Sequence, residues 1–206
     1  MLTKDVDLLV YEPGLFKAWR VAHQQRGKGG DGVLSGTAFS AASGNFMNAG
    51  VAAGDVITLT SIDGMIDGCY EVVGVVSATQ LTVSVLRADE TAAAIPVGAG
   101  SNLIWCISTF YPHRYTGEQW LRDRLALTSD DVDALEAVST RQLRMAMTAA
   151  ALVLVFEALC QTEDEAEFFV RKKEVYEQAV EMHLATLRLN TADAVRRGDT
   201  GQMVRE

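Results

Sequence analysis

The chain has 206 residues, 49% of them hydrophobic, and a formal net charge of −9. This length allows one large domain or two small ones, and the apolar content is enough for a core. Proteins that coat nucleic acid need clustered lysine and arginine to bind phosphates, so the acidic balance argues against that class. The charge is +2 over residues 1–30, −6 over 31–110, −2 over 111–162 and −3 over 163–206, so the acid is concentrated in the middle.

Export and membrane insertion are not indicated. Asp5 and Asp7 occupy the place where a signal peptide would have a basic region and then an apolar run. Two uncharged stretches, 32–54 and 91–113, contain too much Gly, Ser, Asn or Pro to cross a bilayer as helices. We therefore expect no signal peptide and no membrane partner.

The N-terminal residues predict two short helices, over 4–11 and 15–24, separated at Pro13-Gly14. Residues 24–32 follow with four glycines and no periodicity, which indicates a flexible linker or loop. We therefore assign residues 1–30 to an N-terminal helical segment with a glycine-rich linker.

Residues 31–110 are expected to form a β module. Short β-branched segments bounded by Gly, Asp or Ser predict strands at 33–38, 55–62, 69–76, 80–86 and 103–108. Their spacing is typical of a small antiparallel barrel or sandwich. Alternation predicts core-facing side chains at Leu81, Val83, Val85, Leu103, Trp105 and Ile107.

Turn signals separate several of these strands. Asp63-Gly64 and Asp67-Gly68 favour turns, and Ser77-Ala78-Thr79 favours a tight hairpin connection. Hairpins between consecutive strands predict an up-and-down order in this part of the module.

Helical periodicity characterises residues 111–190. A capping box at Thr116 and Gln119 predicts the start of one helix, and carboxylates near Thr128 to Asp131 predict a second that reaches about Cys160. A second capping box, Thr162 and Glu165, precedes a last helix with one apolar side, formed by Ala166, Phe169, Val170, Tyr176, Val180, Leu184 and Leu187.

These patterns together predict an α+β fold, in which a small antiparallel β-barrel or sandwich is inserted in a frame made by a helical hairpin or bundle. Residues 111–190 would form the bundle, with its last two helices antiparallel. Residues 191–206 have little apolar content and indicate a flexible C-terminal extension.

One helical segment, Met145 to Phe156, carries no charge for twelve residues. A central, fully buried helix would explain it without any partner. The alternative is burial against neighbouring subunits, because the segment is too short to cross a membrane. The predicted subunit interface comprises Met145, Met147, Leu152, Leu154 and Phe156.

Signals for chemistry are weak throughout the chain. Cys106 and His113 could in principle form a thiolate pair, but a cysteine between Trp105 and Ile107 is typical of a buried structural residue. No Cys/His spacing suits zinc, and three scattered cysteines indicate a reducing compartment. Gly27-Lys28 lacks the spacing of a phosphate loop. The acids at 163–167 suit a helix N-terminus better than acid–base catalysis. We expect no catalytic, metal or cofactor site.

A family resemblance supplies a sharper expectation. Part of the β module resembles small β modules of tailed-bacteriophage structural proteins, over residues 32–46, 49–57, 68–73 and 81–83. The helical residues 129–190 and the extension after them resemble the head-to-tail connector adaptor family. The resemblance implies a dodecameric ring beneath the portal, around the DNA channel, in the virion neck. It also implies synthesis in the bacterial host cytoplasm.

The partners implied are the portal, the next neck or tail protein, and DNA that passes without sequence-specific binding. The acidic balance suits such a channel, because like charge weakens contacts with phosphates. For portal docking we predict the basic residues of the extension, Arg196, Arg197 and Arg205.

Other functions stay open at this stage. The first is a tail terminator or another tail-completion ring protein. The second is a ligand- or glycan-binding β module, because Trp105, Tyr111 and Tyr115 cluster near the end of the module in sequence. A cysteine-dependent enzyme using Cys106 is the third.

Overall fold

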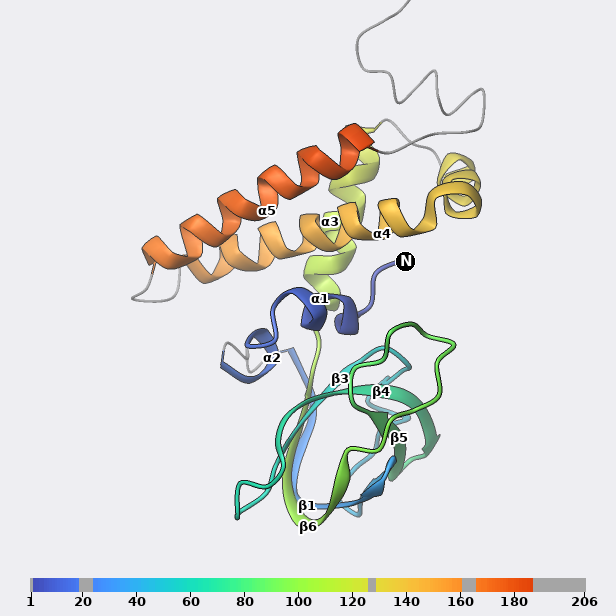
Figure 1. Ribbon diagram of the computed structural model, residues 1–206, viewed down its shortest axis with the longest axis vertical. Helices are drawn as coiled ribbons and strands as arrows, with labels where there is room; N and C mark the ends of the chain where they lie inside the picture. Colours follow the sequence, from blue (N-terminus) through green and yellow to red (C-terminus); the bar gives the residue numbers. More distant parts are fainter. Residues whose placement is uncertain (1, 19–23, 126–128, 161–165, 187–206) are drawn as a thin grey trace, which may run out of the picture. The chain divides into compact units, whose positions relative to one another are not determined.

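The computed structural model describes residues 2–18, 24–125, 129–160 and 166–186 (Figure 1). Within them the chain forms five helices and a closed six-stranded antiparallel barrel. Lys4–Phe110 forms one compact unit, and the described residues after Phe110 form a second unit with Leu2 and Thr3. The expected mixture of helices with a small antiparallel barrel is therefore confirmed.

The barrel unit begins with two short helices, α1 (Asp5–Tyr11) and α2 (Leu15–Ala18). The turn between them lies at Pro13 and Gly14, as predicted. Their apolar side chains Leu8, Leu9, Leu15 and Phe16 are all buried. The helix predicted over 15–24 is confirmed as far as Ala18, and residues 19–23 lie outside the described part of the chain.

The glycine-rich segment predicted as a linker is instead the strand β1 (Gln25–Gly36). A Cβ atom on Gly29 would lie 2.7 Å from the Trp105 indole nitrogen, and one on Gly32 would lie 2.9 Å from the Phe39 ring. Glycine is therefore required here for close packing, not for flexibility. The linker prediction was wrong because the aromatic side chains that fill this space come from distant parts of the sequence.

The remaining strands are β2 (Ala38–Ala41), β3 (Val56–Thr60), β4 (Asp67–Ser77), β5 (Gln80–Ser84) and β6 (Gly98–Ser108). Their order around the barrel is β1-β2-β5-β4-β3-β6, and β6 pairs with β1 to close it. Figure 1 shows β1 beside β6 at this closure.

The strand predictions agree with this barrel only in part. Strands β3, β4 and β5 follow one another up and down, and Ala78 and Thr79 form the predicted hairpin connection. The order is not up-and-down throughout, because β2 pairs with β5. The strand predicted at 33–38 is divided at Thr37, and β6 begins at Gly98, five residues before its predicted start.

The barrel core contains the predicted residues of the last two strands. Leu81, Val83, Leu103, Trp105 and Ile107 are all buried. The prediction for Val85 was wrong: β5 ends at Ser84, and the Val85 side chain is exposed.

Trp105 organises the centre of this core. Its ring meets Phe39 and Phe46 edge to face, with centroid distances of 6.2 and 5.5 Å. The indole N–H donates to Asp31 Oδ1 (3.0 Å), and Ser43 donates to the same carboxylate from its backbone N–H and its hydroxyl (both 2.7 Å). These hydrogen bonds lower the pKa of Asp31 well below its usual range, the bond from Trp105 most of all.

The long connection from β5 to β6 is held by a buried ion pair. Arg87 donates to both carboxylate oxygens of Glu71, at 2.6 and 3.0 Å, and to the carbonyl groups of Glu90 and Ala92. A two-pronged arginine–carboxylate contact fixes geometry as well as charge. This connection is therefore anchored to β4 although it contains few residues in regular structure.

The second unit contains α3 (Tyr111–Arg124), α4 (Ser129–Cys160) and α5 (Ala166–Thr186). In Figure 1, α5 lies along α4 and α3 crosses them. Gly117 of α3 sits directly against α4, since a Cβ there would be 2.9 Å from the Ala151 backbone nitrogen. Phe156 of α4 stacks on Tyr176 and Phe169 of α5, with centroid distances of 5.7 and 6.1 Å.

The predicted start of the first of these helices was wrong. Helix α3 begins at Tyr111, and the supposed capping box of Thr116 and Gln119 lies inside it. Pro112 is accommodated because the first turn of a helix has no internal partner for its backbone N–H groups. The predicted extent of α4 is confirmed. The capping box at 162–165 lies outside the described residues.

Candidate interaction surfaces

The uncharged segment of α4 is mostly interior. Met147, Leu152 and Phe156 are buried within the folded chain, whereas Met145 and Leu154 are partly exposed. The burial of the first three therefore follows from the chain's own packing, as the simpler interpretation of the sequence held. Of the predicted interface residues, Met145 and Leu154 remain accessible to a neighbour.

Helix α5 has an exposed apolar stripe that the sequence analysis missed. Phe168, Val175 and Met182 are 42%, 58% and 57% exposed, and they follow one another at intervals of seven residues. Seven residues make almost two helical turns, so the three side chains lie along one side of α5. The Lys172 amine lies 5.8 Å from the centre of the Phe168 ring, which places a positive charge beside the stripe. The seven-residue interval was the signal available in the sequence.

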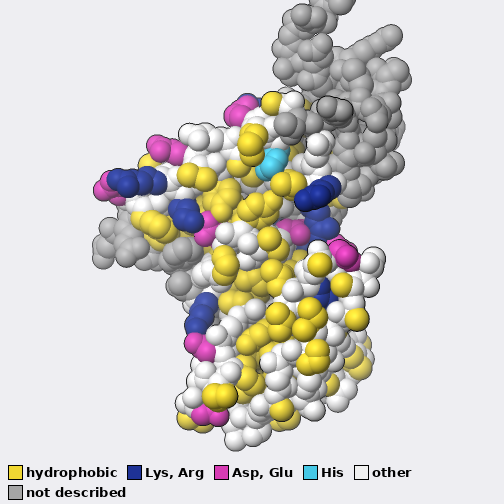
Figure 2. All heavy atoms as spheres, viewed as in Figure 1, with side chains coloured by type: hydrophobic (Ala, Val, Ile, Leu, Met, Phe, Trp, Pro, Cys, Tyr) yellow, Lys and Arg dark blue, Asp and Glu magenta, His cyan; other side chains and the backbone are white. Residues whose placement is uncertain are grey.

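The packed side of α5 is narrower than predicted. Phe169, Tyr176 and Val180 are buried, whereas Val170 is exposed. Phe169 and Val170 are consecutive, so they project about 100° apart around the helix. The face drawn in Figure 2 shows hydrophobic and charged side chains interspersed over the helices.

Aromatic side chains of α3 are also exposed. Tyr111 and Tyr115 stack with a centroid distance of 6.3 Å, and Arg124 lies 5.5 Å from the centre of the Trp120 ring. Trp105, the third residue of the aromatic cluster suspected of binding a glycan, is buried in the barrel core. Trp105 therefore cannot serve as an exposed stacking platform.

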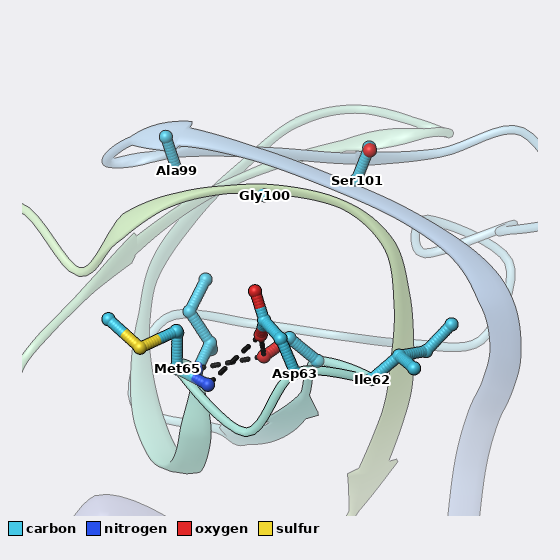
Figure 3. A pocket seen from close by; sticks show the side chains of 8 residues that line it. Ile62, Asp63, Met65, Ala99, Gly100 and Ser101 are labelled. Atoms are coloured by element: carbon cyan, nitrogen blue, oxygen red, sulfur yellow. Dashed lines mark hydrogen bonds between the residues drawn. The ribbon is translucent and has the colours of Figure 1, made fainter.

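The turn between β3 and β4 presents a third surface, which we call the β3–β4 tip and define as residues 61–66. Ile62 and Met65 are highly exposed, and Asp63 lies between them (Figure 3). The tip borders a hollow of about 390 Å³, whose opposite wall is formed by Ala99, Gly100 and Ser101 of β6. The sequence predicted the turn at Asp63-Gly64 but not the exposure of its apolar neighbours.

Side-chain hydrogen bonds of the tip are made to one carboxylate oxygen and one hydroxyl oxygen. Asp63 Oδ1 accepts from the Ser61 hydroxyl (2.5 Å) and from the Met65 backbone N–H (3.0 Å). The Ile66 backbone N–H donates to the Ser61 hydroxyl oxygen (2.9 Å). The bond from Ser61, followed by that from Met65, lowers the pKa of Asp63, so this carboxylate stays ionised at neutral pH.

Residues considered for chemistry do not assemble into a reactive site within the described part of the chain. Cys106 is buried, and its sulfur lies 3.6 Å from the Ser108 hydroxyl. His113 lies on α3 and borders a hollow of about 310 Å³ with Thr116 and Glu157. No group of three or more His, Cys, Asp or Glu suited to a metal ion occurs among the described residues.

The predicted portal-docking residues, Arg196, Arg197 and Arg205, lie outside the described residues.

Within the described part, the segment Arg141–Cys160 of α4 is long and apolar enough to cross a membrane by length and composition. Two thirds of this stretch (67%) is buried inside the folded chain, as in a helix that belongs to a protein core.

Comparison with known proteins completes this description of the chain. No family model, curated protein or solved structure matches it.

Proposed function

We propose that this chain is a structural protein of a tailed-bacteriophage virion, a head-to-tail connector adaptor. Copies would form a ring, a dodecamer in the family it resembles, under the portal and around the DNA channel. The ring would join the portal to the next neck or tail protein. In this proposal α3, α4 and α5 form the helical frame. The barrel, which precedes these helices in the chain, is the β module.

The exposed stripe of α5 is the observation that carries the proposal. Phe168, Val175 and Met182 still expose 42%, 58% and 57% of their surface in the isolated chain, and a neighbouring subunit could bury this apolar area. Complete burial of a large apolar side chain contributes about 1.5–3 kcal/mol, so burial of the exposed part of each of these contributes roughly half of that. In a ring every subunit meets two neighbours through two different surfaces, so the stripe would face another part of the next copy.

The accessible residues of α4 and the exposed aromatic residues of α3 could form that second surface. Met145 and Leu154 are partly exposed, and Tyr111 and Tyr115 are exposed on the same compact unit. A ring interface built from helices would leave the closed barrel available for another virion component. Arg196, Arg197 and Arg205 remain our proposed contacts with the portal.

A tail terminator or another tail-completion ring is the alternative that the same stripe permits. The two roles differ in the partner, because only the adaptor binds the portal. A glycan-binding module has less support, since Trp105 is buried in the barrel core. We propose no enzymatic activity.

The first test is the mass of the purified full chain, measured by light scattering after size exclusion, with and without the portal. A ring-sized species, or a monomer that becomes a ring on the portal, is the expected result. Replacing Phe168, Val175 and Met182 together with serine should reduce that species to monomers. Glu174→Ser, also exposed on α5, is the matched control and should leave it intact.

Replacement of Arg196, Arg197 and Arg205 with alanine separates docking from assembly in the same experiment. The ring should persist while portal binding weakens. A chain that stays monomeric at all concentrations and ignores the portal would contradict the adaptor proposal. A ring that ignores the portal would favour the tail-completion role.

A further inference from the structure

We propose that the β3–β4 tip is a docking surface for a protein segment that presents a lysine or arginine side chain between aliphatic side chains. The proposal concerns a surface of the barrel unit, and it does not depend on the ring or on the virion role. It rests on the exposure of two apolar side chains, on the hydrogen bonds that fix the conformation of their turn, and on the negative charge between them.

The apolar part of the surface is a pair of aliphatic side chains. Ile62 is 89% exposed and Met65 is 83% exposed, more than any other large hydrophobic side chain in the described residues. Single exposed apolar side chains are ordinary on protein surfaces, but two that are this exposed within four residues of one turn offer a surface for contact with a partner. In Figure 3 the two side chains flank Asp63 on opposite sides. The tip therefore presents one aliphatic side chain on each side of a carboxylate.

The turn that carries the pair is ordered by its own hydrogen bonds. Besides the bonds to Asp63 Oδ1, the Ser61 backbone N–H donates to the Ile66 carbonyl (2.7 Å) and the Gly64 N–H donates to the Ser61 carbonyl (3.1 Å). Gly64 has φ +72°, a conformation that glycine adopts without strain. Ile66 is buried in the barrel core. A surface held in advance in this way loses little conformational entropy on binding.

The charge at the centre selects the kind of partner. Asp63 Oδ1 accepts hydrogen bonds from the Ser61 hydroxyl and the Met65 backbone N–H, and the Asp63 side chain is exposed to solvent. The carboxylate points into the hollow of about 390 Å³ below Gly100 (Figure 3). A cation entering the hollow would meet Asp63, while the aliphatic stem behind it would lie against Ile62 and Met65. An acidic segment would meet like charge without compensation.

Another hairpin of the same barrel provides the contrast. The connection from β4 to β5 contains only Ala78 and Thr79, and neither is a large apolar residue. Val76, near the end of β4, is exposed and borders a hollow together with Val33, but no carboxylate of the described residues lines that hollow. Val76 therefore serves as a control for exposure alone.

The experiment uses the full chain labelled at isoleucine δ1 and methionine ε methyl groups, whose signals NMR can follow even in large assemblies. The probe is the peptide acetyl-Leu-Lys-Leu-amide, and acetyl-Leu-Gln-Leu-amide is the neutral reference. We expect the lysine peptide to shift the Ile62 and Met65 signals and to bind about fivefold more tightly than the reference, the size of effect that an exposed ion pair allows.

Two variants test the charge and the apolar side chains separately, and a third is a control. Asp63→Asn keeps an oxygen acceptor for the turn but removes the charge, and it should abolish the preference for lysine. Ile62→Ser with Met65→Ser should remove binding of both peptides, whereas Val76→Ser should change nothing. The ring mass and portal binding of these variants should equal those of the unsubstituted chain, so failure here is distinguishable from failure of the adaptor proposal.

Several results would overturn the inference. They are equal affinity for the two peptides, an unchanged lysine preference in Asp63→Asn, or shifts confined to other methyl groups. Dilution without peptide is a further check. If the Ile62 and Met65 signals move with protein concentration alone, the occupant is a second copy of this chain and not a basic segment.

Discussion

The barrel unit and the helical unit bury their aromatic side chains in opposite ways. In the barrel, Trp105 fits because Gly27, Gly29 and Gly32 leave room for it and its neighbours. In the helical unit, Phe156 is held by the rings of Tyr176 and Phe169, which fill the space between α4 and α5. A closed barrel has a limited interior and tolerates added atoms poorly, whereas a pair of helices depends on the atoms that are present.

The same contrast applies to the surfaces of the two units. The barrel satisfies all its strand edges internally, and its largest exposed apolar pair is confined to the β3–β4 tip. On the helical side, α5 exposes a stripe along its length immediately beside its buried residues. Removing atoms should therefore harm the helical unit most, and adding atoms should harm the barrel.

The largest effect is expected from a deletion in the helical unit. Phe156→Ala removes a fully buried ring and should cost about 3–5 kcal/mol of unfolding free energy, because a cavity remains between α4 and α5. Urea unfolding of the full chain, followed by hydrogen exchange of peptides from each unit, would measure it. Leu154→Ala, at a partly exposed position two residues away, should cost much less. Equal losses in both variants would contradict the assignment of Phe156 to the core.

An intermediate effect is expected from an addition to the barrel. Gly29→Ala would place a methyl group within 3 Å of the Trp105 nitrogen, the Ser43 hydroxyl and the Asp31 carboxylate, and so displace their hydrogen bonds. Overpacking of this kind costs about 1–3 kcal/mol.

Gly30→Ala is the matched control for that addition, because a Cβ on Gly30 would meet no atom within 4 Å. It should be neutral or slightly stabilising, since alanine restricts the unfolded chain. Urea unfolding of both variants, followed by exchange of barrel peptides, decides the comparison. If the two variants behave alike, the glycines of β1 are not there to make room for Trp105.

The smallest effect is expected in the stability of the barrel at low pH. The folded barrel lowers the pKa of Asp31, chiefly through the Trp105 hydrogen bond, below the value of about 3.9 expected in the unfolded chain. The folded state therefore binds fewer protons, and this contribution is complete above pH ~4 and lost as the pH falls further. Asp31→Asn should make barrel stability less dependent on pH between about 4 and 2. Carbon-13 NMR titration of the Asp31 carboxyl group measures the cause directly, and a midpoint near 3.9 would contradict it.

Asp63, Asp67 and Asp89 of the barrel also have lowered pKa values, each chiefly through a side-chain hydrogen bond. Acid should accordingly weaken the barrel. The partners of these groups are Ser61, Lys17 and Thr91 respectively, all of them in the same unit. Amide exchange measured along the chain at decreasing pH would show whether the two units respond separately.

Features that depend on neighbours along the chain could be predicted from the amino-acid sequence. The Ala78-Thr79 hairpin, the inward faces of β5 and β6, and the limits of α4 follow from short-range turn residues, alternation and helical periodicity. The exposed α5 stripe also had a local signal, its seven-residue interval, on a different side of the helix from the one expected to pack.

Features whose causes lie far apart in the sequence became visible only in the folded chain. A run of glycines indicates a linker unless something fills the space beside it, and Trp105 lies 76 residues beyond Gly29. The pairing of β2 with β5, the closure through β6 and the start of α3 at Tyr111 likewise depend on contacts between distant segments. Local propensities are worth fractions of a kcal/mol per residue, about 0–1. Burial of one large side chain is worth about 1.5–3 kcal/mol, so packing prevails where the two conflict.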